Sequence, residues 1–224
     1  MELVRGSPLR NWMGTNRITI RGALAIVQQI AEGLAELHSR GVVHGDLKPE
    51  NVMLTEQGAV TLLDFGLARR HSVPDAGANR GGRSAAPASR SASGFSGTPG
   101  YMAPERFDGR PLDPRVDVFA LGAVVCELLA GTTPFGDRPL SVVRADDPEP
   151  SLPGGRWSEV PAGLRALAAR MMSRDPDRRP VDGAEVLRCL REAIPLRAVV
   201  PTRRWRGRSR GRGSPARVRA APRP

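Results

Sequence analysis

Lysine is almost absent from this chain: its 224 residues contain one lysine, Lys48, and 33 arginines. A bias toward arginine accounts for most of this imbalance, because the two cations replace one another wherever either will serve. A compact, strongly hydrated ammonium differs from the planar guanidinium at positions that need a point charge. The single remaining lysine therefore suggests such a position, although chance also can leave one lysine anywhere.

Cysteine and long apolar runs are scarce as well. The two cysteines, Cys126 and Cys189, lie in apolar helical patterns and predict small buried side chains rather than a disulfide framework. Residues 1–14 hold no apolar run typical of a secretory leader. The most apolar stretch, 116–130, is shorter than a membrane-spanning helix and carries two acids. We therefore expect a cytoplasmic protein without a transmembrane segment.

Acidic residues are missing from the end of the chain. Residues 197–224 hold ten arginines and no acid, so nearly all of the net charge of +11 lies there and the rest is close to neutral. The segment is also rich in Gly, Pro and Ser, and we expect residues 196–224 to form a disordered tail. It could contact nucleic acid or an anionic surface by counterion release. An inert solvated end is the alternative that we favour.

Three short motifs stand out in what remains. Residues 43–52 read Val-His-Gly-Asp-Leu-Lys-Pro-Glu-Asn-Val, with Asp46 and Asn51 five positions apart. Asp-Phe-Gly follows at 64–66, and Gly-Thr-Pro-Gly-Tyr-Met-Ala-Pro-Glu at 97–105. Asp, Pro, Glu and Asn are also common in ordinary turns. In this order and spacing, however, the set resembles the eukaryotic-type protein Ser/Thr kinase family.

This resemblance assigns roles to five side chains. Asp46 would orient the acceptor hydroxyl and take its proton, and Lys48 would neutralise charge on the transferred phosphoryl group. Asn51 and Asp64 would bind Mg²⁺, which prefers carboxylate and carbonyl oxygens. Thr98 would hydrogen-bond to the catalytic aspartate and lysine and shape the acceptor site. The lysine two residues after the aspartate is typical of kinases that act on serine or threonine.

The resemblance also implies ATP as the cofactor. The backbone from Glu2 to Val4 matches the hinge that binds the adenine edge, although a generic N-terminal strand is the alternative. Met53 matches the residue beneath the adenine ring, and a plain core methionine is an equal alternative. The family's Gly-rich loop, strand lysine and partner glutamate would all precede the hinge. We therefore expect the hinge and large lobe only, a small lobe encoded upstream, and poor ATP binding by this chain alone.

Hydrophobic periodicity predicts several helices and a few short β-strands. The resemblance implies that they form a mainly α fold, the large lobe of a protein kinase. The domain would cover residues 1–195, with an activation segment at 64–105 whose middle, 73–97, has little to bury and should be mobile. Helices are predicted at 20–39, 116–130, 161–173 and 183–193, and strands at 42–43, 51–54 and 60–63.

The resemblance further predicts three structural contacts. Asp117 would hold the backbone of the loop around Asp46, and Glu105 would pair with Arg179. His44 would pack against the Asp-Phe-Gly phenylalanine rather than act as a base. His38 matches no motif and is predicted to be an ordinary surface or packing residue.

Two functions follow from these observations. The first is a protein Ser/Thr kinase that transfers the γ-phosphoryl group of ATP to a protein hydroxyl. The second is a catalytically inactive, kinase-like binding module whose basic tail contacts a protein or anionic partner. Upstream DNA that encodes an in-frame Gly-rich loop and strand lysine would favour the first.

Overall fold

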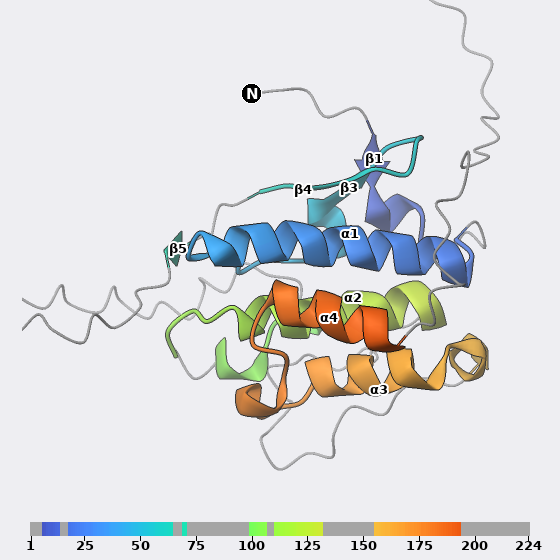
Figure 1. The fold of residues 1–224 in the computed structure, drawn as a ribbon. Helices are drawn as coiled ribbons and strands as arrows, with labels where there is room; N and C mark the ends of the chain where they lie inside the picture. The colour runs from blue at the N-terminus through green and yellow to red at the C-terminus, as the bar shows by residue number, and fades with distance from the viewer. Residues whose placement is uncertain are drawn as a thin grey trace, which may run out of the picture.

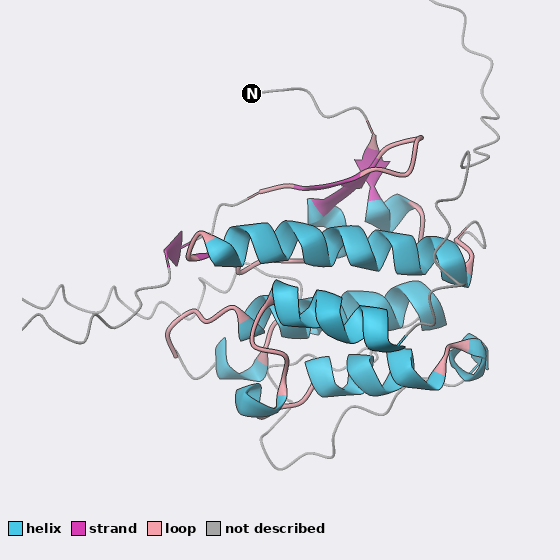
Figure 2. Cartoon of the chain, in the orientation of Figure 1, coloured by secondary structure: helices cyan, strands magenta, loops and turns pink. Residues whose placement is uncertain are grey.

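The computed structural model describes residues 6–13, 18–64, 69–70, 99–106, 110–131 and 155–193. Helices make up most of these residues, and the strands are short (Figure 2). This agrees with the predicted mainly α class. The expected hinge residues Glu2 and Val4, the activation-segment middle at 73–97 and the tail lie outside the described residues.

The longest helix, α1 (Ile20–Ser39), begins and ends at signals that the sequence carries. The Thr19 side chain accepts a hydrogen bond from the Gly22 N–H at 3.1 Å, which satisfies one of the free donors of the first turn. Gly41 follows the helix with φ +69°, a left-handed conformation that suits glycine. The predicted range of 20–39 is confirmed.

The central helix, α2 (Arg115–Ala130), is buried on nearly every side. Its sequence is apolar all round, which is typical of a core helix. It ends at Gly131, which has φ +80°. The other helices are α3 (Ala162–Met171) and α4 (Gly183–Ala193). Figure 1 shows α1 on one side of α2 and α4, with α3 beyond them.

Glycine permits one especially close approach, where α4 begins against α1. A Cβ at Gly183 would lie 2.4 Å from the Ala35 backbone nitrogen and 2.8 Å from the Leu34 carbonyl carbon. A side chain there would push the two helices apart. The start of α4 is therefore held directly against the middle of α1.

A small antiparallel sheet lies on the other side of α1 (Figure 1). It has the order β1 (Ser7–Pro8), β3 (Val52–Leu54) and β4 (Val60–Leu62). The β3–β4 pair is the predicted hairpin, except that Asn51 belongs to a 3₁₀ turn. A second pair joins β2 (Val42–Val43) to β5 (Arg69–Arg70). Within the described ranges, no helix has the length and apolarity needed to cross a membrane.

Candidate active site

Residues 44–51, here called the Asp46 loop, connect β2 to β3 and end in a 3₁₀ turn, Pro49–Asn51. The Lys48 Nζ lies 2.8 Å from Oδ2 of Asp46. The Asn51 Nδ2 donates to the same oxygen at 3.1 Å and to the Asp46 carbonyl at 2.8 Å. The other carboxylate oxygen, Oδ1, accepts no hydrogen bond from the described residues and remains available for a ligand.

The backbone of this loop is held by Asp117 of α2. Its Oδ2 accepts from the His44 N–H and its Oδ1 from the Gly45 N–H, each at 2.8 Å. The carboxylate is almost completely buried, which would be costly without these partners. The predicted contact is confirmed, and it ties the residue preceding Asp46 to the core helix.

His38 helps to hold Asp117 in place, although it matches no motif in the sequence. Its Nε2 lies 3.0 Å from Oδ2 of Asp117, and its Nδ1 accepts from the Gly183 N–H at 3.1 Å. The hydrogen-bond network therefore places the proton on Nε2. Of the two predicted roles, a surface residue or a packing residue, the buried side chain supports packing and excludes the surface. The available signal was its position one turn after Leu34 on the apolar face of α1.

His44 has the structural role that was predicted. It is fully buried, its Nδ1 accepts from the Asp46 N–H at 3.3 Å, and its Nε2 donates to the Leu63 carbonyl at 3.0 Å. Both ring nitrogens are thus bonded to backbone groups, so the ring orients the loop and does not act as a base. The expected contact with Phe65 lies outside the described residues.

Asp64 follows Leu63, whose N–H donates to the Asn51 carbonyl at 2.8 Å. This bond ties Leu63 to the Asp46 loop and so holds the neighbouring Asp64 close to that loop. Asp64 has φ +60°, the one positive φ outside glycine in the described part of the chain. Such a conformation costs on the order of 1–3 kcal/mol, and residues held in it cluster at functional sites. Its exposed carboxylate has no partner among the described residues.

The donors near the Asp46 loop fit a Mg²⁺ ion. Asn51 turns its nitrogen toward Asp46, and within the described residues neither its Oδ1 nor the carboxylate of Asp64 is bonded to another group. Mg²⁺ is commonly held by one or two such oxygens together with substrate phosphates and water. Within the described residues, no group of three or more His, Cys, Asp or Glu forms a metal site. A cation here would therefore need oxygens from a ligand as well.

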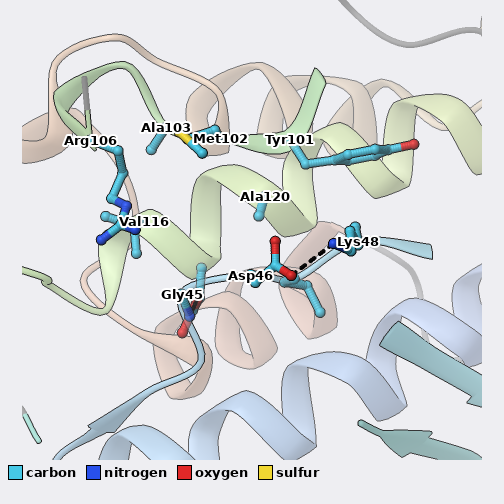
Figure 3. Close-up of a pocket in the computed structure, with 11 residues that line it drawn as sticks. Gly45, Asp46, Lys48, Tyr101, Met102, Ala103, Arg106, Val116 and Ala120 are labelled. Atoms are coloured by element: carbon cyan, nitrogen blue, oxygen red, sulfur yellow. Dashed lines mark hydrogen bonds and ion pairs between the residues drawn. The ribbon is translucent and has the colours of Figure 1, made fainter. Parts of the chain in front are cut away.

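A pocket lies over the Asp46 loop (Figure 3). Lys48 and Tyr101 lie toward one end, and Arg106 and Val116 lie at the other. Asp46 lies between the two ends, and one of its carboxylate oxygens forms an ion pair with Lys48. The apolar part of the lining includes Leu47, Met102, Ala103, Val116 and Ala120.

Arg10 joins three separated segments beside this pocket. Its Nε lies 2.7 Å from Glu50 of the Asp46 loop, and its Nη2 donates to the Tyr101 hydroxyl at 2.6 Å. Its Nη1 pairs with Glu127 of α2, which also accepts from the Tyr101 hydroxyl. Burial and the bond to Glu127 raise the pKa of Tyr101 well above its ordinary value. No motif or periodicity in the sequence indicates this cluster.

The protein kinase domain, as a sequence family, matches residues 1–188. The chain belongs to the protein kinase family. It is 37% identical over 208 residues to the serine/threonine-protein kinase PkaB of Streptomyces coelicolor, which covers 88% of this chain and 46% of that protein. It is 32% identical to the serine/threonine-protein kinase Pkn1 of Myxococcus xanthus over 212 residues, 92% of this chain and 29% of the relative.

A third relative is the serine/threonine-protein kinase PknB of Mycolicibacterium smegmatis, 35% identical over 191 residues, or 83% of this chain and 28% of that protein. The kinase chain therefore spans less than half the length of these curated relatives. Members of this family use ATP and Mg²⁺ and act on protein substrates.

The predicted site residues divide into three groups in this kinase. Asp46, Lys48 and Asn51 are in direct contact. Met53 lies within β3, the first strand of the hairpin that follows the loop, and Asp64 comes two residues after β4, the second strand. The remaining candidates are outside the described residues: Glu2, Val4 and Thr98.

The predicted pair between Glu105 and Arg179 is confirmed. Two parallel bonds join the groups, from Nη1 to Oε1 at 2.6 Å and from Nη2 to Oε2 at 2.8 Å. Arg179 also lies over the Phe119 ring of α2, 4.9 Å from its centroid. The pair fixes the 3₁₀ turn Pro104–Arg106, and with it one wall of the pocket, to the helical base of the kinase.

Proposed function

We propose that this kinase transfers the γ-phosphoryl group of ATP to a serine or threonine hydroxyl of a protein. One observation carries the proposal. The Asp46 carboxylate is fixed by Lys48 and Asn51 through Oδ2, while Oδ1 accepts no hydrogen bond from any described residue and lies beside a pocket. A carboxylate held in this way can orient a hydroxyl and accept its proton.

The reaction would proceed by direct displacement. The acceptor oxygen forms a bond to the γ-phosphorus, the bond to the β,γ-bridging oxygen breaks, and the hydroxyl proton passes to Oδ1 of Asp46. Lys48 stands within reach of the same region and would offset the negative charge that develops. Asn51 and Asp64 would hold Mg²⁺, which neutralises phosphate charge when bound. Thr98 would shape the acceptor site.

We assign the described residues to the large lobe of a kinase, with residues 1–195 forming the hinge and large lobe and 196–224 a basic tail. Glu2, Val4 and Met53 would bind the adenine, whose other face would be covered by a small lobe encoded elsewhere. The buried or half-buried free thiols support action in the cytoplasm.

The test compares the wild-type chain with Asp46→Asn, each alone and each extended by any upstream coding segment. Transfer of labelled phosphate from Mg-ATP to a generic protein substrate is measured. The amide cannot accept the hydroxyl proton, so the rate should fall by roughly 10²–10⁴-fold.

Glu56→Gln is the matched control, because it makes the same chemical change on an exposed turn between β3 and β4. It should leave the rate unchanged. Equal rates for wild type and Asp46→Asn would overturn the assignment of the base. A wild type that transfers no phosphate in either form, but retains a protein partner, would favour the inactive binding module instead.

A further inference from the structure

The acids that line the pocket are already engaged by the protein. Asp46 is bonded to Lys48 and Asn51 through one oxygen. Asp117 accepts two backbone N–H groups and is also paired with His38. Asp117 cannot pair with a cationic substrate side chain unless it gives up bonds that hold the Asp46 loop in place. The remaining oxygen of Asp46, Oδ1, is the one that receives the acceptor hydroxyl in the proposed reaction.

The acids beside the pocket are engaged as well. Glu50 and Glu127 both bind Arg10, and Glu127 also accepts from the Tyr101 hydroxyl. The two carboxylates share one guanidinium, so one negative charge is left uncompensated beside the pocket. Both acids are bonded to Arg10, while Oε2 of Glu50 has no hydrogen-bond partner among the described residues.

Arg106 differs from all of these groups. It lines the pocket, and its guanidinium has no hydrogen bond or ion pair with any described residue. Its backbone is fixed, because the N–H donates to the Ala103 carbonyl at 3.0 Å and the preceding Glu105 is locked to Arg179. The side chain is partly buried and lies beside Val116 at the end of the pocket away from Lys48 (Figure 3).

We propose that Arg106 selects acceptor segments in which an acidic residue stands beside the serine or threonine. This inference rests on the proposed kinase function. A segment that places its hydroxyl at Asp46 and continues along Met102 and Ala103 brings a neighbouring side chain to Arg106. A guanidinium binds a carboxylate by parallel charge-assisted hydrogen bonds. A basic neighbour would be repelled there.

The experiment uses a short alanine-based peptide with one central serine, in which the residue on either side is varied in turn. Aspartate, asparagine and arginine are compared by kcat/KM with the full chain, extended upstream as above. On one of the two sides, aspartate should exceed asparagine by about tenfold, the effect of one hydrogen-bonded charge pair. Arginine on that side should be the poorest substrate.

Two substitutions at Arg106 link this preference to the pocket. Arg106→Gln should remove the advantage of aspartate, and Arg106→Glu should reverse the order so that the arginine peptide is preferred. The control is Arg110→Gln, because Arg110 is an exposed arginine four residues on that does not line the pocket. It should keep the wild-type order. An unchanged preference in both Arg106 variants overturns the inference.

Failure of this inference can be distinguished from failure of the kinase assignment. Transfer to all peptides at equal rates would refute the selectivity and keep the kinase function. If no peptide is phosphorylated, binding of fluorescent versions to Asp46→Asn, with and without Arg106→Gln, still measures the preference. Equal binding of the aspartate and asparagine peptides would overturn it. Thermal melting verifies that each variant is folded. If Arg106→Glu does not fold, the result for Arg106→Gln decides between the outcomes.

Discussion

Replacement of Arg179 by alanine should destabilise this kinase far more than an ordinary surface change. The five N–H donors of the guanidinium all have acceptors. Two go to the carboxylate of Glu105, and the others to the carbonyls of Ser173, Arg115 and Arg174 at 2.6, 3.1 and 3.1 Å. The side chain is fully buried. Alanine would therefore leave a buried carboxylate and three carbonyls without their donor.

The expected magnitude follows from this loss. Removal of one partner of a buried ion pair typically costs about 3–5 kcal/mol, because the other charge remains without compensation. For a domain of this size, each 1 kcal/mol lowers the melting temperature by about 2–4 °C. The melting temperature should therefore fall by roughly 6–20 °C. Arg179→Lys should recover only part of this loss, since an ammonium has three donors and no planar fork.

The assay is thermal unfolding followed by circular dichroism. Arg178→Ala is the matched control, because this neighbouring arginine is 73% exposed and pairs only loosely with Asp175 at 3.7 Å. It should shift the midpoint by no more than about 2 °C. A double change of Glu105→Leu with Arg179→Met should cost less than Arg179→Ala alone, as no charge is left buried. Equal midpoints for Arg179→Ala and Arg178→Ala would refute the reasoning.

Two further predictions concern other buried groups. Arg10→Met should lower the free energy of unfolding, measured by urea titration, by about 1 kcal/mol. The figure is modest because the guanidinium is partly exposed. Arg10→Lys should lose less stability than Arg10→Met, and an unchanged stability in Arg10→Met would mean that the cluster is not stabilising. Burial raises the pKa of the Cys126 thiol to about 12. A thiol reagent at pH 8 should therefore label Cys189 in the folded kinase and reach Cys126 only on unfolding. As the pH rises above about 8.5, the unfolded thiol ionises and the native one does not, so this thiol should lower stability. Cys126→Ala should flatten that decline.

Much of the candidate site could be predicted because its residues are close in sequence. Asp46, Lys48 and Asn51 lie within six positions, and a loop that ends in a tight turn brings them into contact. The roles assigned to them, however, came from the kinase resemblance and not from spacing alone. Asp64 was expected from its motif, but its left-handed backbone was not, since no local pattern required an aspartate in that conformation.

The Arg10 cluster could not have been predicted in the same way. Its partners are 40, 91 and 117 positions away in the chain, and no periodicity links residues at such separations. The same limit explains His38, whose two partners lie on α2 and at the start of α4. The sequence also could not show that Arg106 has no partner among the described residues. This depends on which groups the other charged side chains bind in the folded protein.

The sequence by itself determined the helices, the hairpin and which residues belong to the short motifs. These features depend on hydrophobic period, caps and turn residues within a few positions. The tertiary structure alone decided which charges are paired and which remain free. A carboxylate or guanidinium finds its partner only when distant segments pack together, and burial then sets the cost of leaving it unpaired. Here, packing pairs Lys48 with Asp46 and Arg10 with Glu50 and Glu127, and it leaves Arg106 as the unpaired cation among the described residues that line the pocket.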